Sequence, residues 1–178
     1  MNKEKEIEFA TNFATDFLKE RGSVFPMFHA FLPDGTSALF AVPWRDQDEK
    51  QWALSMLRVV FMVLKVQRYL FYSECWFASC PEGVDPVTYR KGLPRNLEDF
   101  PGRREGLTIL WVSKTSSASV NFEIIRTKEG KLSELKKMAE VSSSTGQMME
   151  LLPGAQDVPS LDERRIAEKM IKEFGIKF

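Results

Sequence analysis

The sequence is poor in the residues that build metal sites and disulfide frameworks. Among its 178 residues there are one histidine, His29, and two cysteines, Cys75 and Cys80. A structural zinc site takes about four Cys or His ligands, and a disulfide-stapled fold takes several cysteines in pairs. The sequence therefore predicts no metal, no cofactor and no disulfide framework. His29 is expected to be an ordinary strand residue, with service as a base for Cys75 or a serine as the alternative.

An excess of charge of either sign is also missing. The 25 Lys and Arg residues cancel the 25 Asp and Glu residues. Proteins that bind nucleic acid through phosphates carry a basic surface. The stretch from residue 68 to residue 105 is rich in aromatic residues, but its basic and acidic residues balance as well. Nucleic acid is therefore not an expected partner.

Long apolar runs are absent too. The most apolar stretch covers residues 56–64, which is far short of the roughly 20 residues that cross a bilayer. The first residues are polar, without the apolar segment of a secretory signal. We therefore expect no membrane partner, a cytoplasmic location and reduced thiols.

The chain lacks the local motifs of common enzyme classes. It holds no glycine-rich phosphate loop, no Gly-x-Ser-x-Gly elbow and no His-Glu-x-x-His helix. What it does hold is the composition of a globular protein, 43% hydrophobic and 28% charged. Its length suits one domain.

Three segments have the apolar spacing of amphipathic helices, residues 3–21, 47–66 and 161–174. The first is expected to end at Gly22. The other two follow capping-box patterns, Asp46 with Glu49 and Ser160 with Glu163. The second half of the middle helix is apolar nearly all round, which is typical of a helix covered on several sides.

Five segments read as strands because they are rich in β-branched and aromatic residues. Two hairpins are expected, one at the Pro-Asp-Gly turn of residues 33–35 and one at the polar turn of residues 115–119. Residues 132–141 fit either a sixth strand or a short helix. Residues 80–102 contain four prolines and no periodicity, so they are expected to be irregular. The expected strands are residues 24–32, 37–42, 69–79, 106–113 and 120–127.

The expected order of elements is α-β-β-α-β-β-β-α, and hairpins imply antiparallel pairing. The sequence thus predicts the α+β class, with a single antiparallel sheet of about five strands covered by helices. The predicted organisation is a core domain over residues 1–141, a linker over 142–159 and a C-terminal helix within 160–178 that packs on the core. This succession is similar to roadblock, longin and profilin-like scaffolds, and more loosely to PAS and GAF sensor domains.

Several short islands resemble an uncharacterised family of small bacterial and phage proteins. No activity accompanies that family, so the resemblance implies one compact domain and no particular chemistry. The islands are Phe28–Gly35, Ala41–Trp44, Ser73–Trp76, Pro101–Glu105 and Ile124–Arg126.

Glu74 is the candidate residue for acid–base chemistry, because a carboxylate in an aromatic strand can be desolvated. Arg103, Arg104 and Glu105 follow the irregular segment, and two guanidinium groups there could bind a carboxylate or a phosphate. The alternative is structural: Glu74 points to solvent or pairs with Arg103, Arg104 or Arg126. The candidate polar site is therefore Glu74, Arg103, Arg104 and Glu105.

The 4 tryptophans are expected to be mostly core, with Trp44, Trp76 or Trp111 exposed as an interaction surface. Three functions follow from these observations. The first is a non-enzymatic interaction module that pairs with itself or another protein through a sheet edge or an aromatic helix face. The second is a small-molecule sensor with residues 80–102 as a lid over a pocket, whose lining would be Tyr72, Glu74, Trp76 and Arg103 or Arg104. The third is an enzyme that acts on an anionic substrate through Glu74 and the two arginines.

Overall fold

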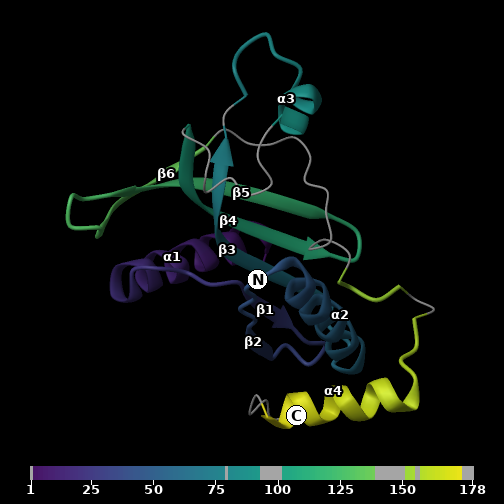
Figure 1. Cartoon of the computed structure of the whole chain (residues 1–178). Helices are drawn as coiled ribbons and strands as arrows, with labels where there is room; N and C mark the ends of the chain where they lie inside the picture. Colours follow the sequence, from purple (N-terminus) through teal and green to yellow (C-terminus); the bar gives the residue numbers. More distant parts are fainter. Residues whose placement is uncertain (1, 79, 93–101, 139–150, 155–156, 174–178) are drawn as a thin grey trace.

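A single antiparallel sheet of six strands organises the fold, in the order β2-β1-β3-β4-β5-β6 (Figure 1). The computed structural model describes residues 2–78, 80–92, 102–138, 151–154 and 157–173. Every neighbouring pair of strands is antiparallel, including the two that the expected hairpins join. The strands are β1 (Met27–Phe31), β2 (Ser37–Ala41), β3 (Arg68–Ala78), β4 (Arg103–Ser113), β5 (Ser117–Arg126) and β6 (Leu132–Lys137).

The helices begin and end where local signals place them. In α1 (Lys3–Arg21), Gly22 adopts a left-handed conformation and its N–H bonds the Leu18 carbonyl. In α2 (Gln47–Val63), the Asp46 side chain accepts from the Glu49 N–H at 2.8 Å. In α4 (Leu161–Glu173), Ser160 and Glu163 cap each other reciprocally.

The sheet separates two hydrophobic clusters, because strand side chains alternate between its faces. On one face, α1 packs against β3, β4 and β6. On the other face, α2 lies over β1 and β3, and α4 packs on α2 (Figure 1). The α1 cluster includes Leu18 and Tyr72, and the α2 cluster includes Phe28, Phe61 and Ile171.

A buried carboxylate fastens α1 to the sheet. Glu6 is fully buried and faces Arg68 on β3, with Nε–Oε1 at 2.9 Å and Nη2–Oε1 at 2.8 Å. The Trp111 indole N–H donates to the second carboxylate oxygen of Glu6, Oε2, at 2.7 Å. Both oxygens therefore have partners, which offsets the cost of burying the charge.

The fold class and the order of the main elements are confirmed, and the sheet has six strands rather than about five. Residues 132–137 form the sixth strand, which settles the alternative of a short helix. β4 begins at Arg103, three residues earlier than expected, because its polar first residues pair with the end of β3. A short helix, α3 (Pro86–Gly92), interrupts the segment expected to be irregular.

The stretch before α4 is held against α2. Leu151 is buried in the α2 cluster, and Asp157 pairs with Arg58 at 2.7 Å. Asp157 also accepts from the Gly154 N–H at 3.0 Å. Of the expected linker, residues 142–150 and 155–156 lie outside the described residues.

Candidate functional site

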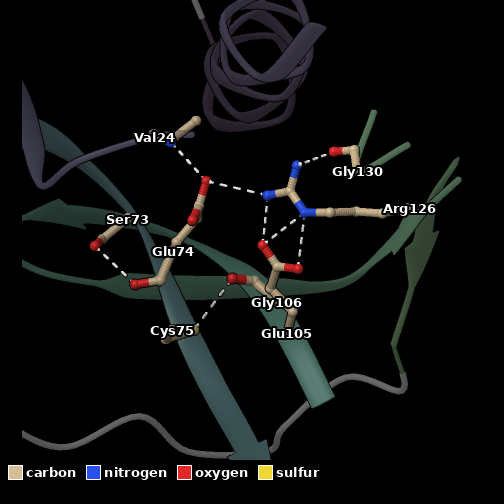
Figure 2. Close-up of polar contacts among 8 residues, drawn as sticks. All are labelled: Val24, Ser73, Glu74, Cys75, Glu105, Gly106, Arg126 and Gly130. Carbon is tan, nitrogen blue, oxygen red and sulfur yellow. Dashed lines mark hydrogen bonds and ion pairs between the residues drawn. The ribbon is translucent and has the colours of Figure 1, made fainter. Parts of the chain in front are cut away.

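Glu74 lies in the middle of β3, on the face that α1 covers. Its Oε1 accepts from the Val24 N–H at 2.6 Å, and its own N–H donates to the Val24 carbonyl at 3.2 Å (Figure 2). Val24 is in the segment that joins α1 to β1. The Glu74 carboxylate therefore fastens that connection to the centre of the sheet.

Glu74 shares a guanidinium group with Glu105. Arg126 on β5 binds Glu105 on β4 through two nitrogens and lies 3.8 Å from Glu74 Oε1 (Figure 2). Its remaining nitrogen donates to the Gly130 carbonyl at 3.2 Å. One arginine thus joins β3, β4, β5 and the turn before β6.

Burial is the main cause that raises the pKa of Glu74, and the nearby Glu105 carboxylate raises it further. The Val24 N–H and the Arg126 guanidinium oppose these effects by stabilising the charged form. The hydrogen bonds from Arg126 to Glu105 raise the pKa of Arg126. Chemically, the cluster holds one carboxylate that takes up a proton more readily than usual, beside a fixed positive charge.

The two arginines expected near Glu74 contact other residues. Arg104 points to the opposite face of the sheet, where it pairs with Glu123 at 3.1 Å. Arg103 stays on the Glu74 face, with its guanidinium carbon 4.8 Å from the centre of the Trp76 ring. Of the expected polar group, the structure brings together Glu74 and Glu105. Arg126, weighed only as a structural partner, joins them.

His29 and Cys75 lie on opposite faces of the sheet. The His29 ring bonds the Ser37 hydroxyl, with Nε2 and Oγ 2.8 Å apart, and stacks on Phe31. Burial lowers the pKa of His29, which favours the neutral ring. Burial raises the pKa of Cys75, whose sulfur lies 3.2 Å from the Thr108 hydroxyl. The alternative of His29 acting as a base for Cys75 therefore has no geometric basis, whereas the alternative of a serine partner meets the geometry at Ser37.

The tryptophans divide differently from the expectation. Trp111 is 8% exposed and donates to Glu6, so it belongs to the core rather than to a surface. Trp44 is half-buried and stacks on Phe71, and Trp76 is half-buried under Arg103. Trp52 on α2, which the sequence reading did not single out, is 64% exposed.

Trp52 stands beside an apolar groove of about 430 Å³, which we call the β2–α2 groove. Its walls come from the end of β2 and from the exposed side of α2, and Met170 of α4 contributes to it. The lining residues are almost all apolar, with Glu49 as the single charged member. Such a groove suits apolar side chains of a ligand or a partner.

The outer edge of β2 borders this groove. β2 ends the sheet on its side, and no described strand pairs with its outer edge. The Val42 N–H donates to the Pro26 carbonyl, and the Thr36 carbonyl accepts from the Leu32 N–H. The even-numbered residues of β2 therefore direct their backbone N–H and C=O groups toward β1. Ser37, Leu39 and Ala41 therefore direct their N–H and C=O groups outward.

Apolar side chains are exposed on the α1 side of the β2 edge as well. Leu39 is 46% exposed and Phe9 on α1 is 45% exposed. The His29 ring lies between these residues, opposite Leu39 in the sheet and 5.7 Å from the Phe9 ring. The uncharged β2 edge thus has apolar surface on both faces of the sheet.

The opposite edge of the sheet has a different character. β6 carries Lys136 and Lys137, and most of its residues are exposed. Charged residues on an edge strand, lysine above all, disfavour pairing with another chain. The lysines therefore protect the β6 edge, whereas the β2 edge has no strand partner within the described part of the chain.

Within the part of the chain that the structure describes, no helix combines the length and the apolar character needed to span a membrane. Among the same residues, no three His, Cys, Asp or Glu side chains gather closely enough to hold a metal ion. Comparison of the chain with protein-family models, with characterised proteins and with solved structures finds no match. The resemblance to small bacterial and phage proteins therefore stays a prediction, and the functional argument depends on the geometry alone.

Proposed function

We propose that this protein is a protein-interaction domain that adds an extended, apolar segment of another polypeptide to its sheet at the β2 edge. The observation that supports the proposal most directly is the open edge itself. Three alternate residues of β2, Ser37, Leu39 and Ala41, offer outward backbone donors and acceptors, and none of the residues of β2 is charged. Strand addition gains affinity from such main-chain groups.

The surroundings of the edge supply a basis for specificity. Side chains of an added strand would alternate between the two faces of the sheet. Those on one face would meet Leu39 and the Phe9–His29 pair, and those on the other would enter the β2–α2 groove beside Trp52. Exposed apolar surface of this kind marks interaction sites, and buried tryptophans contribute strongly to binding energy.

The two other expected functions have less geometric support. For a sensor with residues 80–102 as a lid, Tyr72 is buried in the α1 cluster and residues 93–101 lie outside the described residues. For an enzyme at Glu74, the carboxylate is already engaged by Val24 and Arg126. The β2–α2 groove is the feature that favours an apolar small molecule as a second candidate ligand.

The interaction proposal is tested by site-specific photo-crosslinking in the cell that produces the protein. A photoreactive phenylalanine analogue replaces Trp52, beside the open edge, or Lys136 on the β6 edge as the matched control. We expect covalent adducts with polypeptide from position 52 and only background from position 136. Equal yields at the two positions would contradict the proposal.

A second variant separates strand pairing at the edge from nonspecific hydrophobic association. Ala41→Pro removes an outward N–H without removing a bond to β1, so it blocks strand addition at a position where an edge strand tolerates proline. We expect this change to reduce the adduct yield from position 52 to background. The free energy of unfolding should change by less than about 1 kcal/mol, checked by urea denaturation.

A further inference from the structure

We infer that the polypeptide that pairs with the β2 edge is a second copy of this chain, and that the two copies form a symmetric dimer about a two-fold axis at Leu39. This inference rests on the proposed function of the β2 edge. It adds the identity of the partner and the register of pairing.

The backbone of β2 is compatible with pairing to itself. In an antiparallel pair, residues opposite each other exchange hydrogen bonds when both direct their N–H and C=O groups to the partner strand. Ser37, Leu39 and Ala41 all do so. A two-fold axis at Leu39 places Leu39 opposite the partner's Leu39 and Ser37 opposite the partner's Ala41. Every outward group of β2 then gains a bond.

The side chains of β2 are also self-complementary in this register. On the α2 face, the small Ala38 comes to lie opposite the partner's large Phe40, so no two bulky groups meet. On the α1 face, Leu39 packs against the partner's Leu39. In each copy, the His29 and Phe9 rings extend this apolar surface from Leu39 toward α1. The axis thus joins two exposed apolar patches into one continuous band.

Charge does not oppose self-pairing at this edge. β2 contains no charged residue, so no like charges meet across the axis within the paired strands. The β6 edge carries the exposed Lys136 and Lys137, and lysines on an edge strand disfavour pairing with another chain.

Single-cysteine variants test the register directly. Leu39→Cys is made in a Cys80→Ser background, because Cys80 is the exposed native thiol. Opposed residues in such a pair lie about 5.5 Å apart at Cα, within the range that a disulfide spans. We expect mild oxidation to link Leu39→Cys into a covalent dimer.

The neighbouring positions supply matched controls. Ser37→Cys alone should not cross-link, since two copies of residue 37 lie roughly 13 Å apart along the strand, beyond the span of a disulfide. An equimolar mixture of Ser37→Cys and Ala41→Cys should cross-link. Native mass spectrometry of the unmodified chain should give twice 20.5 kDa. Leu39→Lys should raise the dissociation constant of the dimer by about tenfold or more.

Different results separate the inference from the proposal beneath it. A monomeric mass throughout a dilution series, with no more covalent dimer from Leu39→Cys than from Ser37→Cys, overturns the symmetric dimer. If position 52 still forms photo-adducts with a different polypeptide, the interaction domain stands and only the partner was wrong. If position 52 gives background yields as well, both conclusions fail.

Discussion

At the scale of single residues, Glu74 shows how a sequence pattern acquires a different meaning in the fold. Its strand position places the carboxylate on the face that α1 covers, beside Val24, and burial raises its pKa. The folded protein therefore binds the Glu74 proton more tightly than the unfolded chain does. The resulting contribution to stability is fully present below the unfolded pKa, near 4.5, and is lost as the pH rises through the higher folded pKa.

Glu74→Gln removes this dependence, because glutamine cannot ionise and still offers an oxygen to the Val24 N–H. The free energy of unfolding of the variant, relative to the wild type, should therefore increase between pH 4 and pH 7. Urea denaturation at several pH values measures it. Glu129→Gln is the control of opposite sign, because a hydrogen bond from the Thr127 side chain and one from the backbone of Glu129 itself lower the pKa of Glu129. Parallel pH profiles for wild type and Glu74→Gln would contradict the argument.

At the scale of elements, β4 is shaped by one close approach. A Cβ atom at Gly106 would collide with the Phe77 ring and would lie 2.7 Å from the Phe122 carbonyl oxygen. Glycine inside a strand commonly marks such an approach. Phe77 can lie across β4 because residue 106 has no side chain.

Gly106→Ala is therefore expected to lower the free energy of unfolding by about 2–3 kcal/mol, the usual cost of overpacking. Part of this cost comes from the Phe77 ring, so the same change in a Phe77→Ala background should cost less. A double-mutant cycle by urea denaturation measures the difference. If Gly106→Ala lowers the free energy of unfolding by the same amount in both backgrounds, the Phe77 ring is not the obstacle. The remaining cost in the double variant reports the Phe122 carbonyl, which the backbone cannot easily move.

At the scale of the whole molecule, one sheet supports two hydrophobic clusters on its opposite faces. Leu18 on α1 and Ile171 on α4 are both buried but belong to different clusters. Because the clusters share the strands between them, loss of one should unfold the other. Single domains of up to about 150 residues usually unfold in one cooperative step, and the shared sheet favours the same behaviour in this chain.

Leu18→Ala and Ile171→Ala should each lower the free energy of unfolding by about 2–4 kcal/mol and keep a single transition. The two residues share no cluster, so the double variant should lose the sum of the two effects. Chemical denaturation followed by both tryptophan fluorescence and circular dichroism checks this. A two-step transition in Ile171→Ala would instead mean that α4 and the residues before it unfold independently.

The elements were predictable where a local signal coincides with burial. α1, α2 and α4 were found from their apolar spacing and their caps, and the first hairpin from its Pro-Asp-Gly turn. α3 was missed because seven residues are too few to show a periodic pattern. The polar start of β4 was missed because its pairing partner, the end of β3, is distant in sequence. β6 stayed ambiguous because two lysines interrupt its alternation.

The candidate sites depended on information that the sequence does not carry. Glu74 and Glu105 were noticed as charged residues near aromatic strands, but strand register decided that Arg126 faces them and Arg104 does not. Trp52 is the exposed tryptophan and Trp111 a buried one, contrary to expectation, because composition does not say which tryptophan a neighbouring element covers. Glu6 gave no local sign that it would be buried beside Arg68.

The class of this protein follows from local patterns in its chain: an α+β domain with antiparallel hairpins, balanced charge and few metal-binding side chains. These properties follow from spacing, turns and composition, which act over a few residues. Three properties appear only in the folded molecule: β2 ends the sheet, the backbone groups of its odd-numbered residues point outward, and apolar surface flanks it on both sides. The order of strands is set by contacts between distant segments, because each strand is stabilised by the neighbour it pairs with rather than by its own residues.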